Sequence, residues 1–245
     1  MTKKELFETL RENFKQIVEE NNLDTSKISI KSKGLTPEEA IGNTKRRDYP
    51  ILTGAEIMLM AEYKGSIGQA FTSAPADYEG SLSDIIEADI IENEYDRALF
   101  IASLNAVMRH LGMIEGTVHC KNDGPELCAN QYVPFLKEEY GSPKILQVGY
   151  QPALLDKLAG NFDLRIVDLN PKNIGKVVNG VTVEDGHNFA DILDWADIVL
   201  CTGSTIANGS IVDYMDIGKE VIFYGTTLAG AAKLLGLKRV CFCSE

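Results

Sequence analysis

The sequence predicts an α/β protein in which a small α+β domain, residues 1–113, precedes a doubly wound parallel sheet in residues 114–245. Two patterns predict this architecture. The first half combines alternating, strand-like segments with amphipathic helices. After about Gly112, short apolar runs bounded by Gly, Pro or Asn alternate with helical stretches, which is typical of buried parallel strands covered by helices. The 245 residues, 44% apolar and 24% charged, suffice for one large or two small globular domains.

The first half begins with an amphipathic helix, because Leu6, Leu10 and Phe14 recur at helical spacing between charged residues. Three antiparallel strands and two further helices follow, and Gly112 closes the last helix. The expected strands are 27–33, 55–63 and 66–72, and the expected helices are 81–88 and 93–111, with a short helix after Pro37. We place the domain boundary between Met113 and Thr117, where the pattern changes.

The second half predicts five buried parallel strands with helices between most of them. The strands are expected at 144–149, 164–168, 197–201, 220–224 and 239–243, with a short additional strand at 181–183. The helices are expected at 152–159, 188–195, 210–215 and 226–235. Upstream of these elements, Asp123 and Glu126 have the spacing of a capping box, so another helix is expected from there to about Tyr140.

The charge balance narrows the class of partner. The chain carries 24 basic and 36 acidic residues, a net charge of −12, so it should repel nucleic acids and anionic membranes. The sequence shows neither a long apolar run nor a secretory leader, and we expect a cytoplasmic protein. Its five cysteines are expected to be reduced thiols.

Four turns that follow predicted strands are candidate binding elements, because open α/β sheets bind ligands beyond the carboxyl ends of their strands. We expect Gly149, Asp168, Gly203 and Gly225 to lie on one edge of the sheet. An alternative is that these residue types only satisfy the geometry of strand-to-helix turns. The candidate ligand-binding residues are Gly149, Tyr150, Gln151, Asp168, Asn170, Gly203, Ser204, Thr205, Gly225, Thr226 and Thr227.

The first of these turns argues against NAD as a cofactor, because the next glycine after Gly149 is Gly160 and the dinucleotide fingerprint is absent. Asp168 nevertheless follows Gly149 by 19 residues, near the position where an acid accepts ribose hydroxyls in this architecture. A hydroxylated or adenosyl ligand therefore stays open. The alternative makes Asp168 a turn residue that caps Asn170-Pro171.

The segment 119–128 is the densest chemical signal in the chain. His119, Cys120 and Cys128 are candidate ligands for a transition metal such as zinc, with buried structural cysteines as the alternative. Glu126 is the candidate catalytic acid or base, unless it only completes the capping box. Because Cys128 lies near a helix N-terminus, we expect it to be more reactive than Cys241 and Cys243, which alternate on the last predicted strand and suggest core packing.

Five short motifs, taken in order, resemble the family described as putative heavy-metal chelation. The resemblance covers nearly the whole chain and implies an enolase N-terminal-like domain followed by a Rossmann-like domain, with a cleft between them. We expect the functional site in that cleft, with the helix start at Glu126 to Cys128 on one wall. The motifs are Gly-Pro-Glu-Leu-Cys-Ala at 124–129, Val-Gly-Tyr-Gln-Pro at 148–152, Asp-Leu-Asn-Pro at 168–171, Thr-Gly-Ser-Thr at 202–205 and Tyr-Gly-Thr-Thr-Leu-Ala-Gly at 224–230.

Three functions are compatible with these observations. The first is binding of a metal or of a metal chelator, with a transition metal as the implied cofactor. The second is an enzyme that acts on a small pterin-like or nucleoside-like molecule by condensation, hydrolysis or group transfer. The third is a structural or partner-binding module that uses no cleft. The sequence leaves the oligomeric state open.

Overall fold

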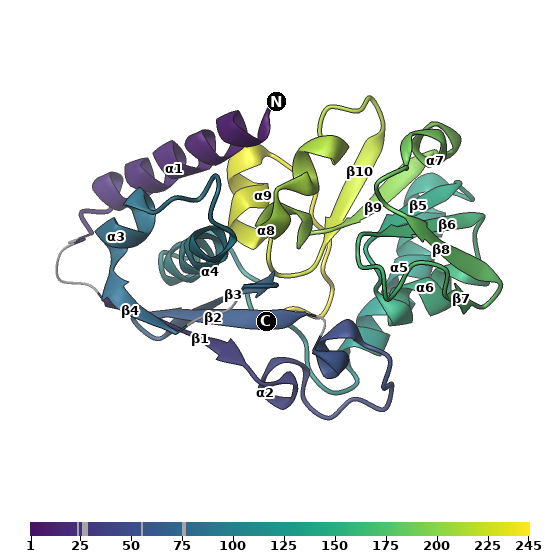
Figure 1. Cartoon of the computed structure of the whole chain (residues 1–245), viewed down its shortest axis with the longest axis horizontal. Coiled ribbons are helices and arrows are strands. Elements are labelled where there is room, and N and C mark those ends of the chain that lie inside the picture. The colour runs from purple at the N-terminus through teal and green to yellow at the C-terminus, as the bar shows by residue number, and fades with distance from the viewer. Residues whose placement is uncertain (24, 26–28, 55, 75–76) are drawn as a thin grey trace.

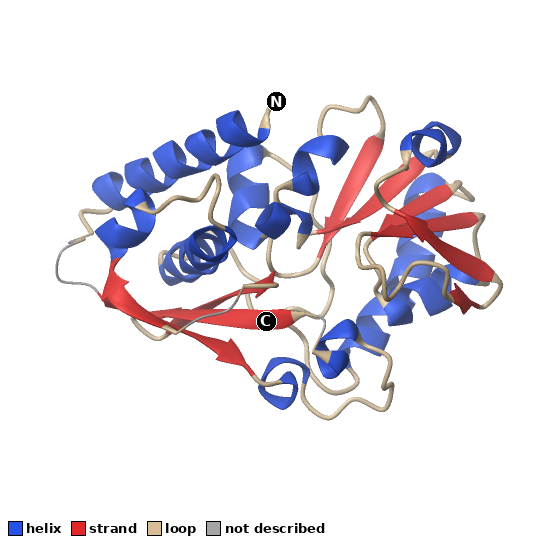
Figure 2. Cartoon of the chain, viewed as in Figure 1, coloured by secondary structure: helices blue, strands red, loops and turns tan. Residues whose placement is uncertain are grey.

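The computed structural model describes residues 1–23, 25, 29–54, 56–74 and 77–245. It contains an antiparallel sheet and a second, mostly parallel sheet, which Figure 2 shows as two separate groups of strands among helices. The expected α/β fold class is confirmed. Within the described residues, no helix has the length and apolar character needed to span a membrane.

The first sheet has the strand order β3-β2-β1-β4, and all its pairings are antiparallel. The expected hairpin is present, and its turn at Lys64-Gly65 has positive φ at both residues. The sequence analysis missed β4, a short strand that pairs with β1. Parts of two predicted strands, residues 27–28 and 55, lie outside the described residues. The strands are β1 (Ser29–Leu35), β2 (Ile57–Tyr63), β3 (Ser66–Thr72) and β4 (Tyr78–Ser81).

The helices of the first half are α1 (Lys3–Glu20), α2 (Pro37–Ile41), α3 (Leu82–Glu87) and α4 (Glu94–His110), with a 3-10 turn η1 (Pro50–Thr53). Helix α4 is buried on every side from Arg97 to Met108. It lies between the first sheet and helix α1, where Figure 1 shows it nearly end-on. Gly68 of β3 permits the close approach of the sheet, because a Cβ there would overlap the α4 backbone at Ala102 and Ala106.

The second sheet has the order β10-β9-β5-β6-β8-β7, parallel except for the short β7 at its edge. Alternate strand residues enter two different cores, so helices cover both faces: α5 and α6 pack on one, and α8 and α9 on the other. The strands are β5 (Ile145–Val148), β6 (Leu164–Asp168), β7 (Val177–Val178), β8 (Val181–Asp185), β9 (Ile198–Thr202) and β10 (Glu220–Tyr224). The helices are α5 (Gly124–Tyr140), α6 (Pro152–Ala159), α7 (Ala190–Trp195), α8 (Thr205–Asn208), η2 (Ser210–Tyr214), a 3-10 helix, and α9 (Ala229–Leu235).

The predicted strand 239–243 was wrong. Only Arg239 bridges to β10, and the chain then turns away from the sheet. Phe242 packs its ring against Tyr132 and Phe135 of α5, with centroids 5.1 and 5.7 Å apart, and Glu245 pairs with the backbone of Val118. The apolar alternation of this segment therefore reflects packing against a helix and not a pleated strand.

The two halves share one hydrophobic core. A single cluster contains α1, α4 and first-sheet residues together with second-sheet residues such as Val199 and Phe223, and helix residues such as Leu228. Asn105 of α4 also donates to the carbonyl oxygens of Gln69 and Thr227, so one side chain bridges both halves. All strands of the first sheet precede residue 113 and all strands of the second follow residue 117.

Candidate functional site

A cavity of about 320 Å³ lies between the first half of the chain and the carboxyl ends of the second sheet. Tyr49, Ile51 and Phe71 contribute apolar wall from the first half. The opposite wall consists of the turns that follow β5, β6, β9 and β10. This volume falls in the range of small-molecule sites, roughly 300–1,000 Å³, and sites of this kind favour the carboxyl edge of α/β sheets.

The predicted edge is confirmed, because Asp168 is the last residue of β6 and Gly149, Gly203 and Gly225 directly follow β5, β9 and β10, which run parallel to β6 in the order β10-β9-β5-β6. Gly203 and Thr226 do not line the cavity. Gly149 has φ +89°, and a Cβ there would meet the side chain of Thr202, so this turn requires glycine. Nine of the eleven candidate residues do line it: Gly149, Tyr150, Gln151, Asp168, Asn170, Ser204, Thr205, Gly225 and Thr227.

The Asp168 carboxylate organises two of these turns. Its Oδ2 accepts from the backbone N–H of Tyr150 at 2.7 Å, and its Oδ1 accepts from the N–H of Asn170 at 2.7 Å. The side-chain amide of Asn173 also donates to Oδ1 at 3.3 Å. These contacts agree with the alternative in which Asp168 stabilises its own turn. The same residue also lines the cavity.

Two of the wall hydroxyls already form hydrogen bonds with backbone groups of the protein. Thr205 Oγ1 donates to the carbonyl of Thr202 at 2.7 Å, and Thr227 Oγ1 accepts from the N–H of Phe71 at 3.0 Å across the two halves. Ser204 and Thr202 hydroxyls lie 2.9 Å apart, and either can donate. These groups are positioned by the fold, and Ser204 keeps the most freedom to bind a ligand.

Glu56 is a titratable group of the cavity that the sequence analysis missed, as it also missed Glu94 and Cys241. It precedes β2 and lines the cavity opposite the second sheet. Burial, and to a smaller extent the nearby charge of Asp168, raises the pKa of Glu56 to about 7. No motif marks this residue, because its environment comes from a turn more than 100 positions away in the sequence. A carboxyl group that titrates near neutrality in a cavity is suited to general acid-base work.

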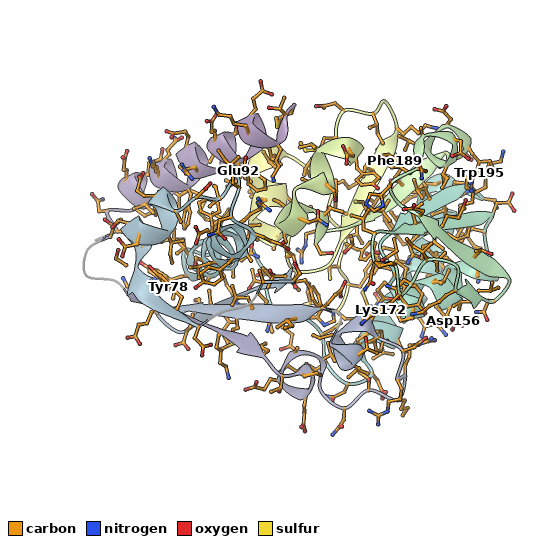
Figure 3. The ribbon with its side chains drawn as sticks, viewed as in Figure 1. Tyr78, Glu92, Asp156, Lys172, Phe189 and Trp195 are labelled. Carbon is orange, nitrogen blue, oxygen red and sulfur yellow. The ribbon has the colours of Figure 1, made fainter. Side chains whose placement is uncertain are left out.

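Glu126 lies outside the cavity. Its Oε1 accepts from Arg46 Nε at 2.6 Å, and Lys157 Nζ lies 3.9 Å from its Oε2. Arg46 also lies 3.3 Å from Asp156 of α6, which Figure 3 labels. The expected capping box is absent, since the Asp123 side chain makes no cap hydrogen bond. The ion pair with Arg46, in the loop before η1, neutralises the charge of Glu126. Glu126 therefore links the loop of the first half to helix α5 of the second half.

The three predicted metal ligands do lie on one wall of the cavity, together with Cys241. His119 Nδ1 is 2.7 Å from the carbonyl oxygen of Cys120, and its ring meets the Phe71 ring edge-on. Burial lowers the pKa of His119 and raises the pKa of Cys120 to about 12. Among the described residues, no three His, Cys, Asp or Glu side chains are arranged to hold a metal ion. The predicted set therefore does not fit a metal centre.

Cys241 belongs to a segment that packs on α5 one turn from Cys128, where the Tyr132 hydroxyl donates to the carbonyl oxygen of Val240 at 2.5 Å and the rings of Tyr132 and Phe242 lie 5.1 Å apart. The nearby thiol of Cys128 lowers the pKa of Cys241, aided by Ser244 and Arg239, and Cys241 in turn raises the pKa of Cys128. These pKa directions run against the expectation that Cys128 is the more reactive thiol, because the neighbouring groups outweigh the helix N-terminus.

Comparison with known proteins connects this arrangement to one family. Residues 136–238 match the model of the family described as putative heavy-metal chelation (DUF364). The resemblance expected from the motifs is confirmed for this part of the chain. Among curated proteins, none matches.

Two crystal structures of proteins of unknown function from the same DUF364 family are similar to the chain. One, from Pyrococcus horikoshii, has a TM-score of 0.53 at 17% identity and covers 91% of this chain and 79% of its own. Another, from Desulfitobacterium hafniense DCB-2, has a TM-score of 0.47 at 13% identity and covers 73% and 72%. The Pyrococcus structure supports the α/β fold over nearly the whole chain.

Proposed function

We propose that the chain binds a small organic molecule in the cavity and that Glu56 exchanges a proton with it. The observation that carries the proposal is a carboxyl group with a pKa of about 7 in a cavity of about 320 Å³. A bare ion would leave most of this volume unfilled. We further infer that the two halves correspond to an enolase N-terminal-like and a Rossmann-like domain, divided between Met113 and Thr117.

The wall chemistry supports a flat, partly polar ligand. Tyr49 and Phe71 offer aromatic surface on one side, and Ser204 and the backbone of the Gly225 turn offer hydrogen-bonding groups on the other. In its protonated form Glu56 donates to a ligand nitrogen or oxygen, and in its ionised form it accepts a proton from the ligand. A pterin-like or nucleoside-like molecule has this character.

The family description favours a ligand that carries a metal. Because the described side chains form no three-ligand metal group, the metal would enter as part of an organic chelate. Such a chelate would contact the same wall residues as a free organic molecule. Metal content is therefore the observation that separates the two ligand types.

Native mass spectrometry of freshly purified protein tests the proposal, because it reports organic ligand, metal and subunit count in one spectrum. We expect an adduct with the mass of a small organic molecule in the wild-type protein, and less of it in Glu56→Gln. Glu62→Gln is the matched control, since Glu62 lies on β2 with its side chain exposed. Equal occupancy in all three proteins, or an adduct of bare metal, would contradict the proposed role of Glu56.

A further inference from the structure

We propose that Cys128 and Cys241 form a peroxide-sensitive dithiol that closes to a disulfide in the cavity wall. Although 113 positions separate the two cysteines, the segment that holds Cys241 packs on α5 one turn from Cys128: the Tyr132 hydroxyl donates to the carbonyl oxygen of Val240 at 2.5 Å, and its ring centroid lies 5.1 Å from that of Phe242. Both line the cavity and both are half-buried, so a small oxidant that enters the cavity reaches them. The fold therefore brings the two thiols to the same part of the cavity wall, which is what a disulfide between them requires.

The surroundings of Cys241 favour its role as the attacking sulfur. Arg239 lies close to it, and a nearby cation favours the thiolate, which is the nucleophilic form. The guanidinium of Arg239 is held by the carbonyl oxygens of Gly225, at 2.7 Å, and Gly116, at 2.5 Å. Its position beside Cys241 is therefore set by the backbone of two separate turns.

The chemistry consumes one equivalent of hydrogen peroxide. The Cys241 thiolate attacks one peroxide oxygen, the O–O bond breaks, and hydroxide leaves with formation of a sulfenic acid. The Cys128 sulfur then attacks the Cys241 sulfur, the S–O bond breaks, and water leaves after the thiol proton is transferred. In sum, two thiols are oxidised by two electrons, and hydrogen peroxide is reduced to two molecules of water.

The remaining thiols are placed differently. Cys201 is buried in β9, where its sulfur lies 3.7 Å from Thr205 Oγ1. Cys243 also contacts Cys128, but it does not line the cavity, and Gln131 Nε2 donates to its sulfur at 3.6 Å. Cys120 lines the cavity as well, but it is buried, and this burial raises the pKa of its thiol to about 12. Cys128 and Cys241 are therefore the pair that we assign among the five free cysteines.

Treatment of the full chain with a small excess of hydrogen peroxide, followed by alkylation and peptide mapping, tests the inference. We expect the free thiols to fall from five to three, with a peptide pair linked through Cys128 and Cys241 that dithiothreitol separates. Cys128→Ser and Cys241→Ser should each abolish the linked pair. Cys243→Ser is the control and should retain it.

Mapping of the wild-type protein keeps the test independent of how the variants fold. A link that involves Cys120 or Cys243 in place of either partner would overturn the pairing. Unchanged thiols, or oxidation of Cys241 to sulfinic acid without a link, would overturn the disulfide. This readout does not depend on the cavity ligand. The dithiol can therefore be confirmed if the proposed function fails, and the proposed function can be confirmed if the dithiol fails.

Discussion

Replacement of Asn105 by Leu should destabilise the whole protein, because this buried amide joins the two halves. Its Nδ2 donates to the carbonyl oxygens of Gln69 and Thr227, both at 3.1 Å, and reaches the carbonyl of Thr226 at 3.4 Å. Its Oδ1 accepts from the N–H of Gly230 at 2.7 Å. Leucine has the same branched shape but is larger, so the change removes the hydrogen bonds without creating a cavity and places methyl groups against the buried backbone groups.

The magnitude follows from the groups left without a partner. Each buried backbone group that loses its partner costs about 1–3 kcal/mol, and at least three are affected. Since the structure relaxes and leucine adds apolar contact, we expect a net loss of about 3–5 kcal/mol in the free energy of unfolding. The protein should still unfold in one transition, because both halves share the core.

Urea unfolding followed by circular dichroism measures this loss. Asn13→Leu is the matched control: Asn13 lies on α1, is half-buried and makes one side-chain hydrogen bond, to the carbonyl of Thr9. We expect the control to lose less than about 1 kcal/mol. A loss below about 1 kcal/mol for Asn105→Leu would refute the bridging role of this side chain.

Three further changes test separate parts of the structure. Gly68→Ala should cost about 3 kcal/mol in urea unfolding, because the new Cβ overlaps the α4 backbone, whereas Gly160→Ala, with open space around it, should cost nothing. The pKa of Glu56 rises from 4.5 to about 7 on folding, so wild-type stability falls relative to Glu56→Gln as the pH rises through this interval, by about 3 kcal/mol in total. Below pH 4.5 the two proteins should be equally stable, and a constant difference across pH would disprove the shift. A double-mutant cycle on Arg46 and Glu126 should give a coupling of about 1 kcal/mol that high salt weakens; zero coupling at low salt would contradict the ion pair.

Much of the fold could be predicted from the sequence because local patterns determine it. Amphipathic spacing located α1, and short apolar runs located β5, β6, β9 and β10. The segment 239–243 was wrongly predicted as a strand, because alternation of apolar residues does not distinguish a strand from a chain segment packed on a helix. The strand β4 was missed because its four residues carry almost no apolar signal.

The site could be predicted only where a residue's role depends on its own turn. The strand-end turns were located because the carboxyl edge of a parallel sheet is implied by the order of elements. Glu56 and Cys241 acquire their properties from Asp168, Cys128 and other groups distant in the sequence. No spacing rule reports such contacts. The ion pair of Glu126 with Arg46 could not be predicted for the same reason, since Arg46 lies in a loop 80 positions away.

The shared core around helix α4 has a consequence for how a ligand enters and leaves. Many cleft proteins open and close by rotation of two domains about a hinge, but here such a rotation would expose buried apolar side chains on both sides of α4. The cavity walls are therefore preorganised, and little conformational entropy is lost on binding. A ligand would then enter and leave by local opening of the loop that contains Arg46, which the ion pair with Glu126 holds against α5. We expect weakening of that ion pair to change the dissociation rate of a ligand more than its equilibrium affinity.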